Sequence, residues 1–293
     1  RETSHVQNLP QVFLFPESTT QVQKIVMLAN QHQVVLSPSS IGINWGYGGN
    51  NPARPGGVVL ILERMNQVLE VNQEQAYAVI EPGVSYENFN RYLKEHNYDL
   101  WIDTIDGLPQ ASVLGNALDR GIGATPYGDH FGCICGLEVV LPNGDIIQTG
   151  GSSAEHPLKT WHTHKWGVGP YVEGLFTQSN FGIVTKAGIW LMPKPEAYSS
   201  YVFELKDESH LGAMIDRFHE FALQGLVSSK LHLINDLVCL QIIRQRYQED
   251  LPPGPISQEK MAELRQKYGF ASWSMAGAIY GNKEILRLQK TVL

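Results

Sequence analysis

A glycine-rich stretch at residues 36–52, LSPSSIGINWGYGGNNP, holds the residues best placed for chemistry. Its glycines are Gly42, Gly46, Gly48 and Gly49, with one bulky residue, Tyr47, among them. Glycine lets backbone N–H groups turn inward and approach an anion, because no Cβ blocks the way. The spacing matches neither G-x-x-x-x-G-K-[ST] nor the G-x-G-x-x-G that opens a helix. It predicts a phosphate-binding loop that is neither a P-loop nor a Rossmann turn, with a flexible turn as the alternative.

Two further groups of residues could bind a metal or do redox chemistry, and each has a simpler explanation. Cys133 and Cys135 form C-x-C, which in a strand points the thiols to opposite faces and favours small buried residues over a metal or redox pair. His162 and His164 could share one strand face, but no third ligand is evident nearby. We therefore expect no metal. No G-x-S-x-G hydrolase elbow occurs.

The composition is that of a globular protein. At 293 residues the chain suggests two domains, and no segment approaches the ~20 apolar residues that span a bilayer. The net charge of −7 and the scattered basic residues argue against a nucleic-acid surface. Three cysteines are too few for a disulfide framework, so they leave the compartment open. We expect a soluble, cytoplasmic chain with neither nucleic acid nor membrane as partner.

Strands and helices alternate through the first two thirds of the chain. The apolar spacing predicts a helix over residues 20–33, and branched runs predict strands over residues 34–36, 58–62, 68–71, 77–80 and 181–191. Ser85 is placed to cap a helix. Residues 137–141 and 146–149 flank Asn143 and Gly144, a hairpin signal because this pair tolerates positive φ.

The prolines of Met192-Pro193-Lys194-Pro195 mark the best domain boundary, which predicts domains at residues 1–195 and 196–293. Beyond it we expect strands near residues 201–205, 231–234 and 273–280, and helices over residues 211–221, 257–269 and 285–293. Ser257 is placed to start the second of these helices and Gly269 to stop it. No glycine or proline ends the last helix, so we interpret the chain as a fragment of a longer protein.

Five motifs in order resemble one known family. They are SIGINWGYGGNNP (40–52), VLEVNQEQAYAVIEPGVSYENFNRYLKEHN (68–97), LWIDTIDGLPQASVLGNALDRGIGATPYGDH (100–130), GLEVVLPNGDIIQTG (136–150) and GPYVEGLFTQSNFGIVTKAGIWLMP (169–193). Together they resemble the vanillyl-alcohol oxidase family of flavoproteins, in particular its 4-alkylphenol branch. The resemblance implies an α+β fold: an FAD-binding domain of two α+β subdomains, followed by an incomplete α+β cap domain.

The resemblance also implies the contacts with FAD. The glycine-rich stretch becomes the pyrophosphate loop, where aligned backbone dipoles meet the phosphate charges because no lysine is placed to do so. Residues 112–116 and 125–130 resemble two flavin-contacting turns, and residues 182–184 resemble the strand along the adenine. The implied cofactor-binding residues are Ser40, Ile41, Gly42, Ile43, Asn44, Gly46, Tyr47, Gly48, Pro82, Ser112, Val113, Leu114, Gly115, Asn116, Tyr127, Gly128, Gly136, Gly182, Ile183 and Val184.

Two residues are implied to be catalytic. In the branch, a tyrosine at the position of Tyr47 hydrogen-bonds the phenolic oxygen of the substrate; a core or lid residue is the alternative. An aspartate at the L-W-x-D-x-x-D spacing, here Asp106, lies beside flavin N5 and can act as base toward water. The 4-cresol members lack this acid, so Asp106 favours the oxidases, while an exposed acidic turn is the alternative. Asp129 and His130, adjacent in a turn, are interpreted as structure near the flavin.

The resemblance implies oxidation of para-substituted phenols, by hydride transfer from the benzylic carbon to flavin N5 through a quinone methide. Two alternatives stay open: a 2-hydroxyacid or sugar oxidase or dehydrogenase of the same fold, and a truncated flavin-binding protein without turnover. The residues for covalent flavin attachment and for the rest of the phenolate pocket are expected beyond Leu293. Family habit predicts at least a homodimer, and nothing in the sequence indicates the cytochrome partner that the family allows.

Overall fold

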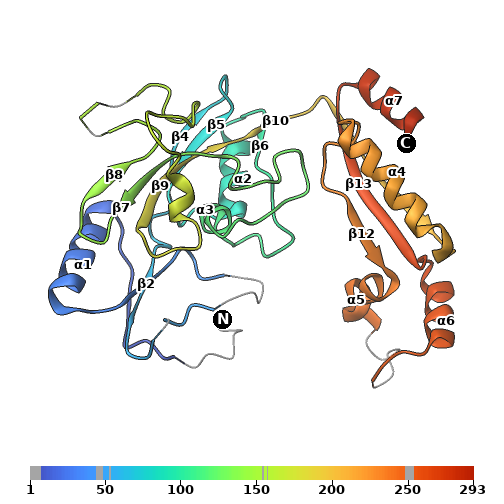
Figure 1. The fold of residues 1–293 in the computed structure, drawn as a ribbon, viewed down its shortest axis with the longest axis horizontal. Coiled ribbons are helices and arrows are strands. Elements are labelled where there is room, and N and C mark those ends of the chain that lie inside the picture. The colour runs from blue at the N-terminus through green and yellow to red at the C-terminus, as the bar shows by residue number, and fades with distance from the viewer. Residues whose placement is uncertain (1–7, 44–48, 53, 154, 157, 248–253) are drawn as a thin grey trace. The chain divides into compact units, whose positions relative to one another are not determined.

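The computed structural model describes residues 8–43, 49–52, 54–153, 155–156, 158–247 (backbone alone for 243–247) and 254–293. The chain divides into two compact units (Figure 1). Unit 1 is Arg1–Gly123 with Tyr127–Lys194, and unit 2 is Ala124–Pro126 with Pro195–Leu293. None of the helices in the described ranges is long and apolar enough to cross a membrane.

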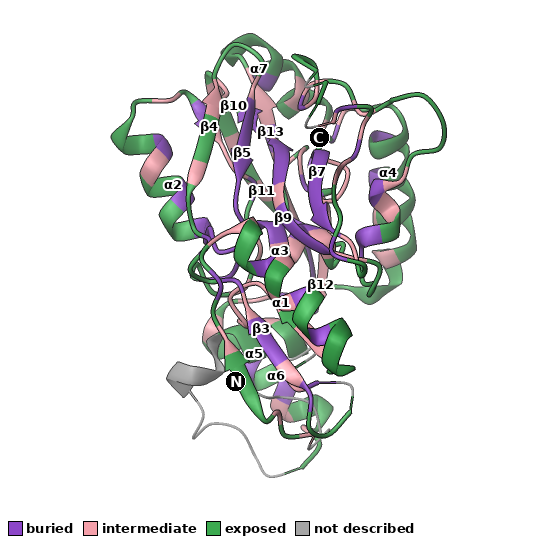
Figure 2. Ribbon diagram, turned by 90° about the vertical axis from the view of Figure 1, so that its left-hand side faces the viewer, coloured by how far each residue is buried: buried purple, intermediate pink, exposed green. Residues whose placement is uncertain are grey.

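The core of unit 1 is a five-stranded antiparallel sheet with the order β4-β5-β9-β7-β8. Its strands are β4 (Val68–Asn72), β5 (Tyr77–Ile80), β9 (Ile183–Trp190), β7 (Ile134–Val140) and β8 (Ile146–Gln148). Every residue of β5 and β7 is buried, as Figure 2 shows. Strands buried on both faces read as continuous apolar runs, which is the pattern that the sequence carries here.

Helices and a loop cover the two faces of this sheet. From α2 (Tyr86–Glu95) and α3 (Val113–Leu118), Phe89 and Leu114 pack against Ile80 and Leu137. Ser85 caps α2 as predicted, because its hydroxyl accepts a hydrogen bond from the Asn88 N–H. On the other face, the Trp190 indole donates to the carbonyl of His162 at 2.9 Å, which ties a loop to the sheet.

A small parallel sheet with the order β1-β3-β2 completes unit 1, with β1 (Val12–Leu14), β3 (Val58–Ile61) and β2 (Leu36–Ser39). Helix α1 (Thr19–His32) supplies Val22 and Val26 to its core. The strand predicted at residues 34–36 begins only at Leu36, because Gln33 ends α1 with φ +51° and the Val34 N–H still bonds to Ala29. Short strands β6 (Leu100–Trp101) and β10 (Met192–Pro193) pair, and η1 spans Glu173–Phe176.

Unit 2 is a three-stranded antiparallel sheet with helices. The order β11-β13-β12 joins Ala197–Leu205, Trp273–Gly281 and His232–Asn235. Its helices are η2 (Glu208–His210), α4 (Leu211–Leu223), α5 (Asp236–Tyr247), α6 (Gln258–Tyr268) and α7 (Lys283–Val292). Ser257 caps α6 and Gly269 ends it in the left-handed region, as predicted. Phe218 and Phe221 of α4 pack with Met275 of β13.

Candidate functional site

Segments far apart in sequence meet at α3. The Ser112 hydroxyl donates to the Pro82 carbonyl at 2.6 Å and accepts from the Gly115 N–H at 2.8 Å, so it caps the helix. A Cβ on Gly115 would collide with the Ser40 hydroxyl. Glycine is therefore what lets the start of the glycine-rich stretch lie against this turn. The fold brings together three of the predicted FAD-contacting segments.

The described part of the glycine-rich stretch has the features of an anion cradle. Gly42 has φ +77°, and its carbonyl accepts a hydrogen bond from the Asn50 amide at 2.9 Å. No hydrogen bond within the described residues involves the backbone N–H groups of Ile41, Gly42 or Ile43. Backbone donors without a partner among the described residues, beside a positive-φ glycine, fit a phosphate group, so the residues present suit FAD. Asn44, Gly46, Tyr47 and Gly48, also predicted to contact FAD or substrate, lie outside the described residues.

Four other predicted cofactor residues lie around β7 and β9. Gly136 has φ +81°, and a Cβ there would collide with the Trp161 indole, so packing alone accounts for this glycine. Gly182 similarly abuts Val139. Ile183 and Val184 are buried at the start of β9.

In the third predicted turn, residues 125–130, the adjacent side chains of Asp129 and His130 have different surroundings. The Gly128 carbonyl accepts from the Gly123 N–H at 2.9 Å, which closes the turn. Tyr127 is half-buried, and its carbonyl accepts from the Cys133 thiol at 3.5 Å. Asp129 is exposed and accepts from the Gly132 N–H, whereas His130 is buried. Adjacent in sequence, Asp129 and His130 point to different surroundings.

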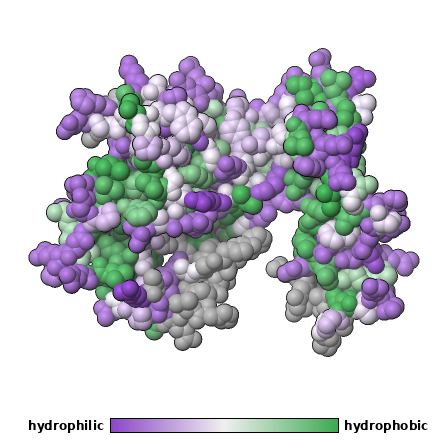
Figure 3. Space-filling view, viewed as in Figure 1, coloured by the Kyte–Doolittle hydropathy of each residue, from purple (hydrophilic) through white to green (hydrophobic). Residues whose placement is uncertain are grey.

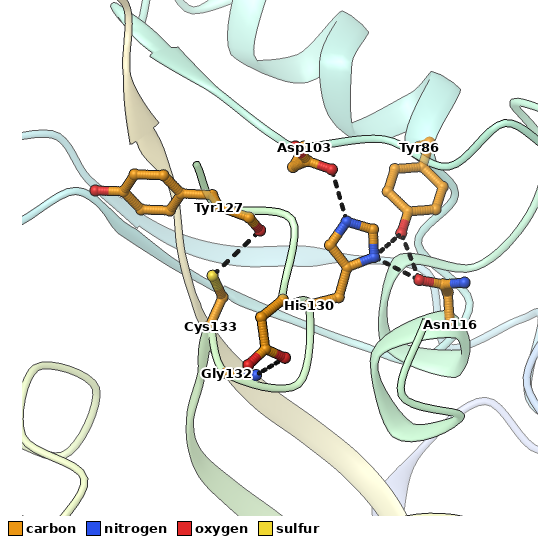
Figure 4. Close-up of polar contacts among 8 residues, drawn as sticks. Tyr86, Asp103, Asn116, Tyr127, His130, Gly132 and Cys133 are labelled. Atoms are coloured by element: carbon orange, nitrogen blue, oxygen red, sulfur yellow. Dashed lines mark hydrogen bonds and ion pairs between the residues drawn. The ribbon is translucent and has the colours of Figure 1, made fainter. Parts of the chain in front are cut away.

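His130 lies between two side chains that come from other segments (Figure 4). Its Nε2 is 2.8 Å from Asp103 Oδ1, and its Nδ1 is 2.5 Å from Asn116 Oδ1. The Tyr86 hydroxyl donates to the same Asn116 oxygen at 3.2 Å. We call Tyr86, Asp103, Asn116 and His130 the buried polar cluster.

Burial sets the electrostatics around this cluster. Desolvation, and then the negative charge of Asp103, raise the pKa of the Tyr86 hydroxyl. Desolvation also raises the pKa of the Cys133 thiol to about 11, against the opposing effect of Lys165. Both groups therefore stay protonated at neutral pH. They line a small cavity together with Asp103, Tyr127 and His130.

Asp106 and Asp103 have opposite surroundings although they share one loop. Asp103 is buried in the polar cluster, while Asp106, three residues later, is exposed. Sequence reasoning missed the pair of Asp103 and His130, because the two residues stand 27 positions apart. Nothing in the sequence signals that they meet.

The His162 site is structural. His162 Nδ1 lies 2.9 Å from the Cys135 carbonyl, and burial lowers the pKa of His162. Cys133 and Cys135 are both free thiols. Over the described ranges, no three His, Cys, Asp or Glu residues are grouped in a way that could hold a metal ion.

Comparison with known proteins identifies the fold. Residues 10–150 match a family described as an FAD binding domain, which confirms the predicted cofactor. The 1'-carboxy-chondrochloren decarboxylase of Chondromyces crocatus is 40% identical over 90% of this chain and 49% of its own length. The 4-cresol dehydrogenase [hydroxylating] flavoprotein subunit of Pseudomonas putida is 33% identical over 94% of this chain and 53% of its own.

A solved structure extends the match to the whole chain. The 4-ethylphenol oxidase from Gulosibacter chungangensis, in complex with isoeugenol, has a TM-score of 0.92 at 33% identity and covers 99% of this chain and 56% of its own. The predicted α+β, FAD-binding fold is thus confirmed, and the chain spans about half the length of the relatives it matches. This chain belongs to the vanillyl-alcohol oxidase family of FAD-binding flavoproteins and is similar to its 4-alkylphenol branch.

Proposed function

We propose that the whole protein is an FAD-dependent oxidoreductase that oxidises para-substituted phenols at the benzylic carbon. The observation that carries this proposal is the match to a 4-ethylphenol oxidase over 99% of this chain, through both units. The similarity to a 4-cresol dehydrogenase subunit supports the same class of substrate. In this proposal residues 1–195 form the FAD-binding domain and residues 196–293 the first part of the cap.

FAD, when bound, supplies an acceptor for the hydride. The chain's own part is to hold and orient that group. The backbone donors of Ile41, Gly42 and Ile43 would meet phosphate oxygens, and Gly115 allows the α3 turn to approach the same place. Orientation of this kind lowers a barrier because the reacting atoms no longer have to be brought together from solution.

Two side chains are proposed to act on the substrate. The Tyr47 hydroxyl would donate a hydrogen bond to the phenolic oxygen, which favours loss of the phenol proton. The Asp106 carboxylate, exposed in the loop between β6 and α3, would accept a proton from water as the oxygen attacks the quinone methide. Without that base, the quinone methide would instead give its vinylphenol isomer, as the side-chain carbon next to the benzylic carbon loses a proton and the ring oxygen gains one.

Anaerobic stopped-flow experiments on the full-length protein test these roles. Replacing Tyr47 by Phe should slow flavin reduction by a 4-alkylphenol roughly 10- to 100-fold with FAD still bound, because one hydroxyl donor is lost. Asp106→Asn should slow reduction and lower the ratio of hydrated to vinyl product. Asp99→Asn, an exposed aspartate near the same loop, is the matched control and should leave both quantities unchanged. Unchanged kinetics in both test variants would remove these residues from the proposal.

A second reaction deserves a direct test, because the relative with 40% identity is named a decarboxylase. In this alternative the substrate carries a carboxyl group, and loss of CO2 accompanies its reaction. Incubation with a 4-alkylphenol that bears a side-chain carboxylate, and with its decarboxylated analogue, separates the two. Release of CO2 with flavin reduction only by the carboxylated compound would favour decarboxylation. Reduction by the simple alkylphenol would favour benzylic oxidation.

A further inference from the structure

The buried polar cluster contains a fully enclosed pair of charged side-chain types. The side chain of Asp103 is 2% exposed and that of His130 is 5% exposed. Removing a carboxylate from water is costly, and a well-packed apolar pair of similar size often serves stability as well or better. Stability alone is therefore a weak explanation for placing this pair here.

The cluster joins the segments on which the proposed function depends. Asp103 lies in the loop between β6 and α3 that also carries Asp106, Asn116 lies in α3, and His130 ends the third predicted turn. A Cβ on Gly123 would collide with both Asp103 Oδ1 and His130 Nε2, so the backbone of that turn is pressed against the pair. His130 belongs to the third segment, and its imidazole ring contacts side chains from the other two.

The contacts of the ring are directional. Nε2 faces the carboxylate at 2.8 Å and Nδ1 faces the Asn116 amide oxygen at 2.5 Å, on opposite sides of the ring. Tyr86 stays protonated, because burial and Asp103 raise its pKa, and so it remains a donor to the same amide oxygen. Hydrogen bonds at both nitrogens fix the rotation of the ring as well as its position.

Resting on the proposed function, we propose that His130 is a positioning residue of the flavin site. Its Nε2 orients Asp103, and with it the loop that presents Asp106. Its Nδ1 orients Asn116, and with it the α3 turn that lies against Ser40. A small displacement of such a support changes rates far more than it changes binding, because catalysis depends on the alignment of the reacting atoms.

The test uses FAD-loaded full-length protein with His130→Gln and Asp103→Asn, and Asp99→Asn as the exposed control. Both test variants should keep FAD and lower the limiting rate of flavin reduction by a 4-alkylphenol about 10- to 100-fold. The dissociation constant of the phenol should change by less than about twofold. The visible circular dichroism of the bound flavin should change in both, and the control should match wild type in every measurement.

A merely structural role predicts a different result. It lowers the unfolding temperature and leaves the limiting rate and the flavin dichroism at wild-type values, which would overturn the proposal. If a single variant fails to fold, the neutral pair Asp103→Asn with His130→Gln replaces it. That double variant should fold and stay slow, and a wild-type rate in it would also overturn the proposal. If wild type is not reduced by phenols, the proposed function fails, and the dichroism of the resting flavin alone decides the inference.

Discussion

The main sheets of the two units differ in how many of their faces are covered, and the sequence pattern of their strands reflects this difference. In unit 1 every residue of β5 and β7 is buried, because helices lie on one face and a loop on the other. In unit 2 the residues of β11 alternate between half-buried and exposed, and Tyr198 and Val202 are each 62% exposed. Figure 2 shows the buried strands of unit 1, and Figure 3 shows hydrophobic side chains at the surface of both units. A continuous apolar strand thus marks the doubly covered sheet, and an alternating strand marks the singly covered one.

Two charged side chains, one from each unit, have opposite surroundings. In unit 1, Glu138 accepts from Thr19, Thr185 and Lys186 within 2.9 Å, and its side chain is only 10% exposed. On α4 of unit 2, Arg217 and Glu220 pair at 3.1 Å with both side chains more than half exposed. The described residues proposed here to act on FAD or substrate all belong to unit 1. Gly115 and Gly123, where a Cβ would collide with neighbouring side chains, lie in this unit as well.

The largest expected effect is the loss of stability when a buried carboxylate of unit 1 is removed. Glu138→Ala should lower the free energy of unfolding by about 3 kcal/mol, because Lys186 and the buried Thr185 hydroxyl lose their acceptor. Glu220→Ala, its counterpart on α4, should change it by no more than about 0.5 kcal/mol. Urea unfolding of the two variants measures both numbers. Equal losses would show that burial does not decide how much these two carboxylates contribute.

The next prediction compares a glycine-to-alanine substitution in α3 of unit 1 with the same substitution in α4 of unit 2. Gly115→Ala places a Cβ against Ser40 and should weaken FAD binding about 10- to 100-fold, the equivalent of the ~1–3 kcal/mol that overpacking costs. Gly212→Ala in α4 meets nothing within 4 Å and should stabilise the protein by up to ~1 kcal/mol through helix propensity. Flavin fluorescence titration and thermal melting measure these outcomes. Full FAD affinity in Gly115→Ala would mean that the cradle is not at α3.

The smallest effect concerns thiol reactivity. Burial raises the pKa of Cys135 to about 11, although Lys165 opposes the shift. A raised pKa leaves less thiolate at a given pH, and Cys135 is also fully buried, so it should react slowly with iodoacetamide at pH 8. The pKa of Cys239 in unit 2 is raised by burial too, but its side chain is partly exposed. We expect Cys239 to react at least about tenfold faster. Mass spectrometry after timed labelling measures the ratio, and comparable rates would contradict the burial of Cys135.

Local patterns predicted most of the elements. Ser85 and Ser257 predicted the N-terminal caps of α2 and α6, and Asn143 with Gly144 predicted the hairpin of β7 and β8. These predictions succeeded because such signals act over only a few residues. Helix α5 was missed, since its apolar residues follow no clear helical stripe. The short strand β1 was missed as well, because only pairing with β3 defines it.

The site was less predictable than the elements. Gly115 and Ser112 could be placed by resemblance, but the contact of Gly115 with Ser40 depends on tertiary structure. The pair of Asp103 and His130 arises in the same way, from a turn folding back onto a distant loop. Sequence patterns report local geometry and burial, so they identify the segments of a site and not the contacts between them.

The central claim is that the whole protein oxidises para-substituted phenols with bound FAD. Anaerobic addition of a 4-alkylphenol to the purified, FAD-loaded full-length protein tests it most directly, with the visible absorbance of the flavin as the readout. A 2-hydroxyacid and a reducing sugar, added in parallel, provide the comparison. We expect the flavin band to bleach with the alkylphenol and to persist with the other two. Bleaching by the hydroxyacid or the sugar alone, or by none of the three, would contradict the claim.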